Sequence, residues 1–192
     1  MDTQTLVVLV LAGLMGYLLY DTYFNAEVDY VEASDGNKYL VRDMPDKKEA
    51  ANLLAQVRAR SERLIEHLKK AKPEDPRTIQ LFTNFRADKL SEGGDNAKYT
   101  SYSVNKGERI IFCLRARDGT NKLADINTVM FVAIHELGHL CTTDIGHTKM
   151  FWDNFRWLLE DSLDIGIYVK DDYKNNPQSY CGIEITSSPL DK

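Results

Sequence analysis

The pentapeptide His135-Glu136-Leu137-Gly138-His139 has the residue types and the spacing of a metal site that hydrolyses carbonyl compounds. Two histidines four positions apart lie on one face of a helix, so their ring nitrogens can reach the same tetrahedral Zn²⁺. Glu136 lies beside that face, where its carboxylate can take a proton from a zinc-activated water. We therefore predict a zinc ion with His135 and His139 as ligands and Glu136 as the catalytic general base.

The third ligand of that zinc must come from elsewhere in the chain. His147 lies eight residues after His139 and is the one further histidine downstream. With a water in the fourth position, His135, His139 and His147 would complete the tetrahedral set. Asp144 and Cys141 are the alternative ligands, although a cysteine is more often a small buried residue.

The apolar sequence around the motif supports a metal site. Residues 129–140 read VMFVAIHELGHL, which is typical of a buried helix. Burying two imidazoles and a carboxylate is costly unless they have partners, and a metal ion is such a partner. The alternative is that these histidines are ordinary core or surface residues.

The composition limits the class of protein. The chain has 192 residues, 43% of them hydrophobic and 28% charged, which predicts one globular core of roughly 150 residues plus an appendage. A disordered tail or a fibrous repeat is excluded. Because 24 Lys and Arg oppose 29 Asp and Glu, the net charge is -5, and we expect no nucleic-acid partner.

The appendage is the N-terminus. Between Asp2 and Asp21 lie eighteen uncharged residues, of which Leu6 to Tyr20 are apolar or glycine. This length is short but meets the lower limit for a helix that spans a bilayer. We predict an N-terminal transmembrane helix in a membrane anchor over residues 1–25, with membrane contact through residues 5–20, and a second domain over residues 26–192. The protein would then be a single-pass membrane protein of unknown orientation. A cleaved signal peptide and a docked core helix are the alternatives.

The first half of the second domain mixes strands and helices. Residues 27–41 alternate around an Asp-Gly turn and predict a β-hairpin. Asp46, with Glu49 three residues later, forms a plausible capping box for a helix that ends before Pro73. A second helix is expected over residues 78–90.

The second half contains the metal motif. Residues 98–114 predict another hairpin, and Asp125 is a suitable N-cap for the helix that runs into His135. An amphipathic helix is expected after His147, and the tail from Asp171 reads as a loop. Strands followed by helices predict an α+β domain.

The cysteines predict no cross-link. They are odd in number, widely spaced and form no C-x-x-C pair: Cys113, Cys141 and Cys181. We therefore expect reduced thiols.

The motif and its flanks resemble a known family. HELGHL followed by IGHTKMFW is similar to the core of WLM and SprT-like zinc metallopeptidases, in which an aromatic residue lies four positions after the third histidine. In this chain the two residues are His147 and Phe151. The runs YSVNKGERIIFCLRARDG and DINTVMFVAIHELGHL, with GIY and YCG, are most similar to the small WLM-like proteins encoded by large DNA viruses. This resemblance covers most of residues 27–186.

The resemblance implies a zincin-like metallopeptidase core, with a small antiparallel sheet, a helix that carries the HExxH motif, and an enzyme of the gluzincin or WLM-like type. It implies His135, His139 and His147 as zinc ligands and Glu136 as general base. Proteases of the Wss type have a shorter spacer with Gly-Pro before the third histidine, whereas this chain has residues 140–146 there. Their DNA-linked substrates are therefore not carried over.

The leading hypothesis is a membrane-anchored zinc metallopeptidase that hydrolyses a peptide or protein substrate. The hairpin that ends in RIIFCLR would supply the edge strand on which an extended peptide pairs. An alternative is a weakly active or inactive structural or adaptor protein of a membrane or virion, with viral capsid proteins as partners. A third, a repair protease for DNA-crosslinked proteins, is disfavoured by the negative charge. Four side chains are candidates to stabilise the oxyanion, with none preferred: Tyr102, Arg115, Tyr168 and Tyr180.

Overall fold

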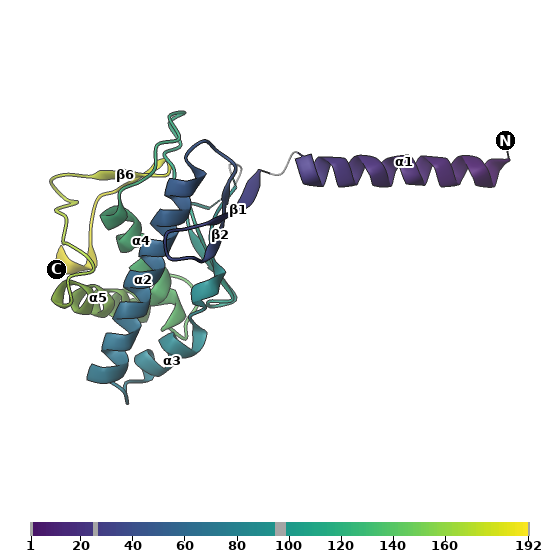
Figure 1. The fold of residues 1–192 in the computed structure, drawn as a ribbon. Coiled ribbons are helices and arrows are strands. Elements are labelled where there is room, and N and C mark those ends of the chain that lie inside the picture. The colour runs from purple at the N-terminus through teal and green to yellow at the C-terminus, as the bar shows by residue number, and fades with distance from the viewer. Residues whose placement is uncertain (1, 25–26, 95–98, 192) are drawn as a thin grey trace.

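A computed structural model of the protein describes residues 2–24, 27–94 and 99–191 (Figure 1). The main sheet has five strands in the order β1-β2-β3-β5-β4. Both predicted hairpins are confirmed, because β1 pairs with β2 and β4 pairs with β5 in antiparallel fashion. The strands span Val28–Glu32 (β1), Lys38–Arg42 (β2), Leu90–Glu92 (β3), Tyr102–Val104 (β4) and Arg109–Phe112 (β5).

The predicted sheet was antiparallel, but the observed sheet is mixed. Strand β3 runs parallel to both β2 and β5. It follows the helices α2 (Lys47–Ala71) and α3 (Pro76–Asn84), which carry the chain back so that β3 runs in the same direction as β2. Only three residues make β3, too few for alternation to reveal it in the sequence.

Helix α2 covers the sheet and packs against the motif helix (Figure 1). Its apolar face is buried, and it ends before Pro73 as predicted. The predicted capping box is wrong, because the Asp46 carboxylate makes no cap bond and instead accepts hydrogen bonds from Arg115 Nη1 at 2.6 and 2.7 Å. The next helix, α3, stops at Asn84, earlier than predicted, because Phe85 is extended.

Two further helices pack against each other and against α2. Helix α4 (Ile126–Leu140) contains the metal motif, and α5 (Lys149–Asp164) follows it, both as predicted. Asp125 caps α4 as predicted, since its side chain accepts hydrogen bonds from the backbone N–H groups of Asn127 and Thr128. The α+β class is therefore confirmed.

The predicted membrane anchor over residues 1–25 is wrong. Residues Thr3–Phe24 form helix α1, which projects from the rest of the molecule (Figure 1). Within the described ranges, however, no helix combines the length and the apolar character that crossing a bilayer requires. The run from Leu6 to Tyr20 has 15 residues, about 22 Å of helix against a hydrocarbon core of about 30 Å. The predictions of a transmembrane helix and of a single-pass membrane localisation are therefore both wrong.

The tail is more ordered than predicted, and two cysteines are cross-linked. Residues Gln178–Tyr180 (β6) and Ile183–Ile185 (β7) form a small hairpin, and a short 3₁₀ helix, η2, spans Pro189–Asp191. Cys113 and Cys181 form a disulfide, so the expectation of reduced thiols holds for Cys141 alone. Because the two cysteines are 68 positions apart in the sequence, only the fold brings them together.

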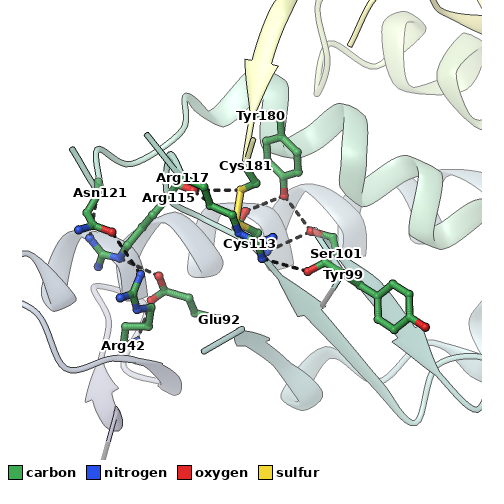
Figure 2. Close-up of a disulfide and its surroundings, with 10 residues drawn as sticks. All are labelled: Arg42, Glu92, Tyr99, Ser101, Cys113, Arg115, Arg117, Asn121, Tyr180 and Cys181. Carbon is green, nitrogen blue, oxygen red and sulfur yellow. Dashed lines mark hydrogen bonds and ion pairs between the residues drawn. A yellow bond between two sulfur atoms is a disulfide. The ribbon is translucent and has the colours of Figure 1, made fainter. Parts of the chain in front are cut away.

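Figure 2 shows this disulfide at the end of β5, where it ties the β6–β7 turn to the sheet. Beside it, the Tyr180 hydroxyl donates to the carbonyl oxygen of Cys113 at 2.6 Å and lies 2.8 Å from Ser101 Oγ. Ser101 Oγ also accepts from the backbone N–H of Cys113 at 3.1 Å. The tail is thereby fastened beside the start of β4.

Candidate metal centre

Three histidine side chains converge at the C-terminal half of α4. The candidate ligand atoms of His135, His139 and His147 all lie within 4.8 Å of one another. The closest pair is His135 Nε2 and His147 Nε2, at 3.1 Å. The helix positions the first two residues one turn apart, and the loop between α4 and α5 brings the third to them. The structure thus assembles the three predicted ligands, while their metal-binding role stays a prediction.

Aromatic packing from α5 fixes the two helical imidazoles. The Phe151 ring is fully buried, stacks on His139 with a centroid distance of 4.2 Å, and meets the His135 ring edge-on at 4.8 Å. Gly138 permits this close approach, because a Cβ atom there would lie 3.2 Å from the Phe151 ring. The aromatic residue of the family pattern therefore holds the histidines in place.

Burial keeps the two helical imidazoles neutral. It lowers the pKa of His135 to about 3, with a further contribution from the neighbouring histidines. Burial also lowers the pKa of His139 to about 4, helped by His147 and Lys106. A neutral imidazole has the free nitrogen lone pair that a metal needs. These side chains are therefore in a state suited to coordination at neutral pH.

Glu136 is buried beside the triad, with 4% of its surface exposed. Burial raises the pKa of Glu136 to about 7, and hydrogen bonds from the side chain and backbone of Ser103 oppose the rise. A general base works best when its pKa lies near the working pH. Sequence reasoning missed Ser103, which no motif marks and which only the fold brings to Glu136.

A cavity of about 490 Å³ lies in front of these residues. Its walls are the three histidines, Glu136, strand β4 and the loop at residues 144–147. Strand β4 lies at the end of the strand order, whereas β5 is flanked by β3 and β4. The predicted hairpin therefore supplies the edge strand of the site through β4, and not through RIIFCLR itself.

A second cavity of about 420 Å³ also has His135 in its lining. Phe131, Trp152 and Phe155 form its apolar wall, and residues 187–191 of the tail line it as well. Phe131 and Phe155 are buried, whereas Trp152 is 44% exposed. Since His135 lines both cavities, the aromatic cavity borders the histidine cluster.

The four oxyanion candidates fall in different places. Tyr102 lines the cavity in front of Glu136. Tyr180 is buried beside the disulfide, Arg115 is paired with Glu92 and Asp46, and the Tyr168 hydroxyl contacts that of Tyr173 in the core.

The two alternative ligands, Asp144 and Cys141, lie in different surroundings. Asp144 lines the cavity, but its carboxylate accepts a hydrogen bond from Thr148 Oγ1 at 3.1 Å. Cys141 is buried, and burial raises the pKa of its thiol to about 12, so it stays protonated. The three histidines remain the donor set that the geometry favours.

Comparison with known proteins places the chain in a family. The family model described as the WLM domain matches residues 35–189. The chain is 36% identical over 170 residues to "Uncharacterized protein R325" of Acanthamoeba polyphaga mimivirus, covering 86% of each. It is 32% identical over 94 residues to "Uncharacterized protein 136R" of Invertebrate iridescent virus 6, covering 48% of each.

Among solved structures, Wss1 from Saccharomyces cerevisiae is similar, with 21% identity and a TM-score of 0.49 over 66% of this chain and 87% of that one. The chain belongs to the WLM domain family. The resemblance to WLM-like proteins of large DNA viruses is confirmed by these viral relatives.

Proposed function

We propose that the protein is a zinc-dependent peptidase, with His135, His139 and His147 as zinc ligands and Glu136 as general base. The observation that carries this proposal is the convergence of three imidazoles within 4.8 Å at a cavity that also contains a buried carboxylate. Imidazole nitrogens suit zinc, whereas calcium and magnesium prefer oxygen ligands. The donor set present therefore fits the metal that the family resemblance implies.

The proposed mechanism assigns a proton transfer to Glu136. Zinc, when bound, would polarise the peptide carbonyl and activate the attacking water. Glu136 takes the proton that this water loses and then delivers it to the nitrogen of the leaving amine. Hydrogen bonds from Ser103 stabilise the charged form of this carboxylate, which is the form that accepts the proton. Tyr102, on the cavity wall, is the remaining oxyanion candidate.

The proposed substrate is an extended peptide. Strand β4 is the edge of the sheet, so its outer backbone groups can pair with a substrate strand. The aromatic cavity beside His135 has room for a large apolar side chain next to the bond that is cut. We therefore expect a preference for peptides with an aromatic or large aliphatic residue at that position.

The test compares the wild-type chain with Glu136→Gln on a mixed peptide library. Gln keeps the shape of the side chain but cannot take a proton, so we expect hydrolysis to fall by about 10²- to 10⁴-fold. Zinc content should stay the same in both proteins. Full activity in Glu136→Gln would contradict the mechanism. No hydrolysis by a zinc-loaded wild type would favour the alternative, a structural or adaptor protein.

A further inference from the structure

The loop between the second and third histidines is held by side chains from three other elements. Five successive carbonyl oxygens, those of residues 140–144, each accept a hydrogen bond from a side chain. Asn84 Nδ2 donates to Leu140 at 2.9 Å, and Asn154 Nδ2 donates to Cys141 at 3.4 Å. Lys106 Nζ donates to the next three carbonyls.

The lysine is the centre of this arrangement. Its ammonium group lies 2.6 Å from the carbonyl oxygens of Thr142 and Thr143 and 3.0 Å from that of Asp144. An ammonium group has three N–H donors, so these contacts can use all of them. Its positive charge also lies just past the C-terminus of α4, where the helix dipole favours a cation. The N–H donors of Lys106 are therefore used to bind the loop.

The turn between β4 and β5 fixes the position of this lysine. Asn105 and Lys106 have φ angles of 45° and 52°, and Gly107 has 110°, so three successive residues occupy the left-handed region. Such strain in non-glycine residues persists only where surrounding contacts impose it. A Cβ atom on Gly107 would lie 2.4 Å from the carbonyl oxygen of Asn84, so the turn is packed closely against its neighbour.

His147 needs such support more than the other two histidines. His135 and His139 are fixed by helix α4, whereas His147 is exposed on the loop. On its far side the loop is fixed by Thr148, whose hydroxyl caps α5 and donates to the Asp144 carboxylate. On its near side Lys106 binds the carbonyl oxygens of all three residues 142–144. The Thr142 hydroxyl adds contacts at the start of this segment, since it donates to the Gly138 carbonyl oxygen at 2.6 Å and accepts from Asn154 Nδ2 at 2.9 Å. For Asp144, the last residue before the turn to His147, the backbone contact comes from Lys106.

We propose that Lys106 is a positioning residue of the metal centre, which holds the 142–144 segment so that His147 faces His135 and His139. It also links the edge strand β4 to the third ligand, because it lies in the turn that ends β4. This inference rests on the proposed function, since it requires that the three histidines bind zinc.

The test measures zinc affinity of the full chain by competition with a chromophoric chelator. We compare the wild type with Lys106→Met, which has no donors, and Lys106→Arg, which restores them. We expect a 10- to 100-fold loss of affinity in Lys106→Met, the range typical of residues that orient metal ligands, and partial recovery in Lys106→Arg. Lys122→Met, on an exposed lysine of a distant loop, should bind zinc like the wild type.

A second readout separates positioning from general stability. Co²⁺ in place of zinc gives visible absorption bands whose intensity reports tetrahedral geometry, and these should weaken or shift in Lys106→Met while the metal-free protein stays folded. Should Lys106→Met fail to fold, Lys106→Gln, with two neutral donors, is used, with a smaller loss of affinity expected.

Two results are distinguishable. Wild-type affinity and an unchanged cobalt spectrum in a folded Lys106→Met would overturn the positioning role and leave the peptidase proposal intact. A folded wild type that binds no zinc would overturn both.

Discussion

Two clusters of buried ionisable side chains in this protein differ in how they are neutralised, because only one of them is held by ion pairs between its own members. The arginine cluster consists of Arg115, Glu92 and Asp46. Its guanidinium group pairs with Glu92 at 2.7 Å and with Asp46 at 2.6 Å, and both Arg115 and Glu92 are almost fully buried. The second oxygen of Glu92 accepts from the backbone N–H of Arg42 at 2.8 Å. Each carboxylate of the cluster therefore has a cationic partner, as Figure 2 illustrates for Arg115 and Glu92.

The histidine cluster, made of His135, Glu136, His139 and His147, has no such ion pairing. Among the described residues no ion pair reaches these four side chains, and burial instead shifts the pKa values of three of them toward the neutral form. Paired buried charges serve structure, whereas buried titratable groups left without a counter-charge are typical of functional sites. The contrast supports a ligand role for the histidine cluster and a structural role for the arginine cluster.

The largest effect is expected from breaking the arginine cluster. Arg115→Met leaves the Glu92 carboxylate buried without its cation, and we expect the free energy of unfolding to fall by about 3 to 5 kcal/mol. Urea unfolding measures this. Zinc affinity of the folded fraction should not change. A loss of zinc affinity with unchanged stability would reverse the roles of the two clusters.

The disulfide gives the next effect. Replacing Cys113 and Cys181 by serine removes a link across 68 residues, and the free energy of unfolding should fall by about 2 to 4 kcal/mol. None of the three histidines lies on the tail hairpin, so zinc affinity should stay within about threefold of wild type. Chelator competition on the double variant checks this, and a much larger loss would mean that the tail supports the histidine cluster.

Zinc itself should stabilise the fold by a comparable amount. A ligand at 100 times its dissociation constant adds about 2.7 kcal/mol when it binds only the folded chain. We expect thermal unfolding of the wild type to shift upward with zinc and that of His139→Ala to stay unchanged. An equal shift in both proteins would show that zinc binds elsewhere.

The smallest effect concerns the carboxylate in the histidine cluster. Glu136→Gln removes a group whose charged form is penalised by burial, so the metal-free protein should gain about 1 kcal/mol of stability near neutral pH. Urea unfolding without zinc measures this gain. A loss of more than 1 kcal/mol of stability would mean that Glu136 has a structural role, like the charged residues of the arginine cluster.

Local signals allowed much of the fold to be predicted. The Asp125 cap and the apolar run after it predicted α4, and alternation around tight turns predicted both hairpins. The parallel strand β3 and the disulfide were missed because they depend on contacts between distant segments. The anchor was wrong because eighteen uncharged residues between Asp2 and Asp21 were accepted as enough to span a bilayer, although only the 15 from Leu6 to Tyr20 are apolar or glycine.

The candidate site was predictable where it depends on spacing along a helix. His135, Glu136 and His139 follow from one motif, and His147 follows from counting the remaining histidines. Lys106 gave no signal, because its role depends on a turn that packs against the end of α4. Sequence thus identified the groups that could do chemistry, and the fold identified those that hold them.

The central claim is tested most directly by the zinc content of the full chain, measured by elemental analysis beside His139→Ala and His67→Ala. His67 lies outside the cluster, 3.4 Å from Asp161, and serves as the matched control. We predict about one zinc per chain in the wild type and in His67→Ala, and none in His139→Ala. A folded wild type that holds no zinc, or equal zinc in all three proteins, would contradict the account.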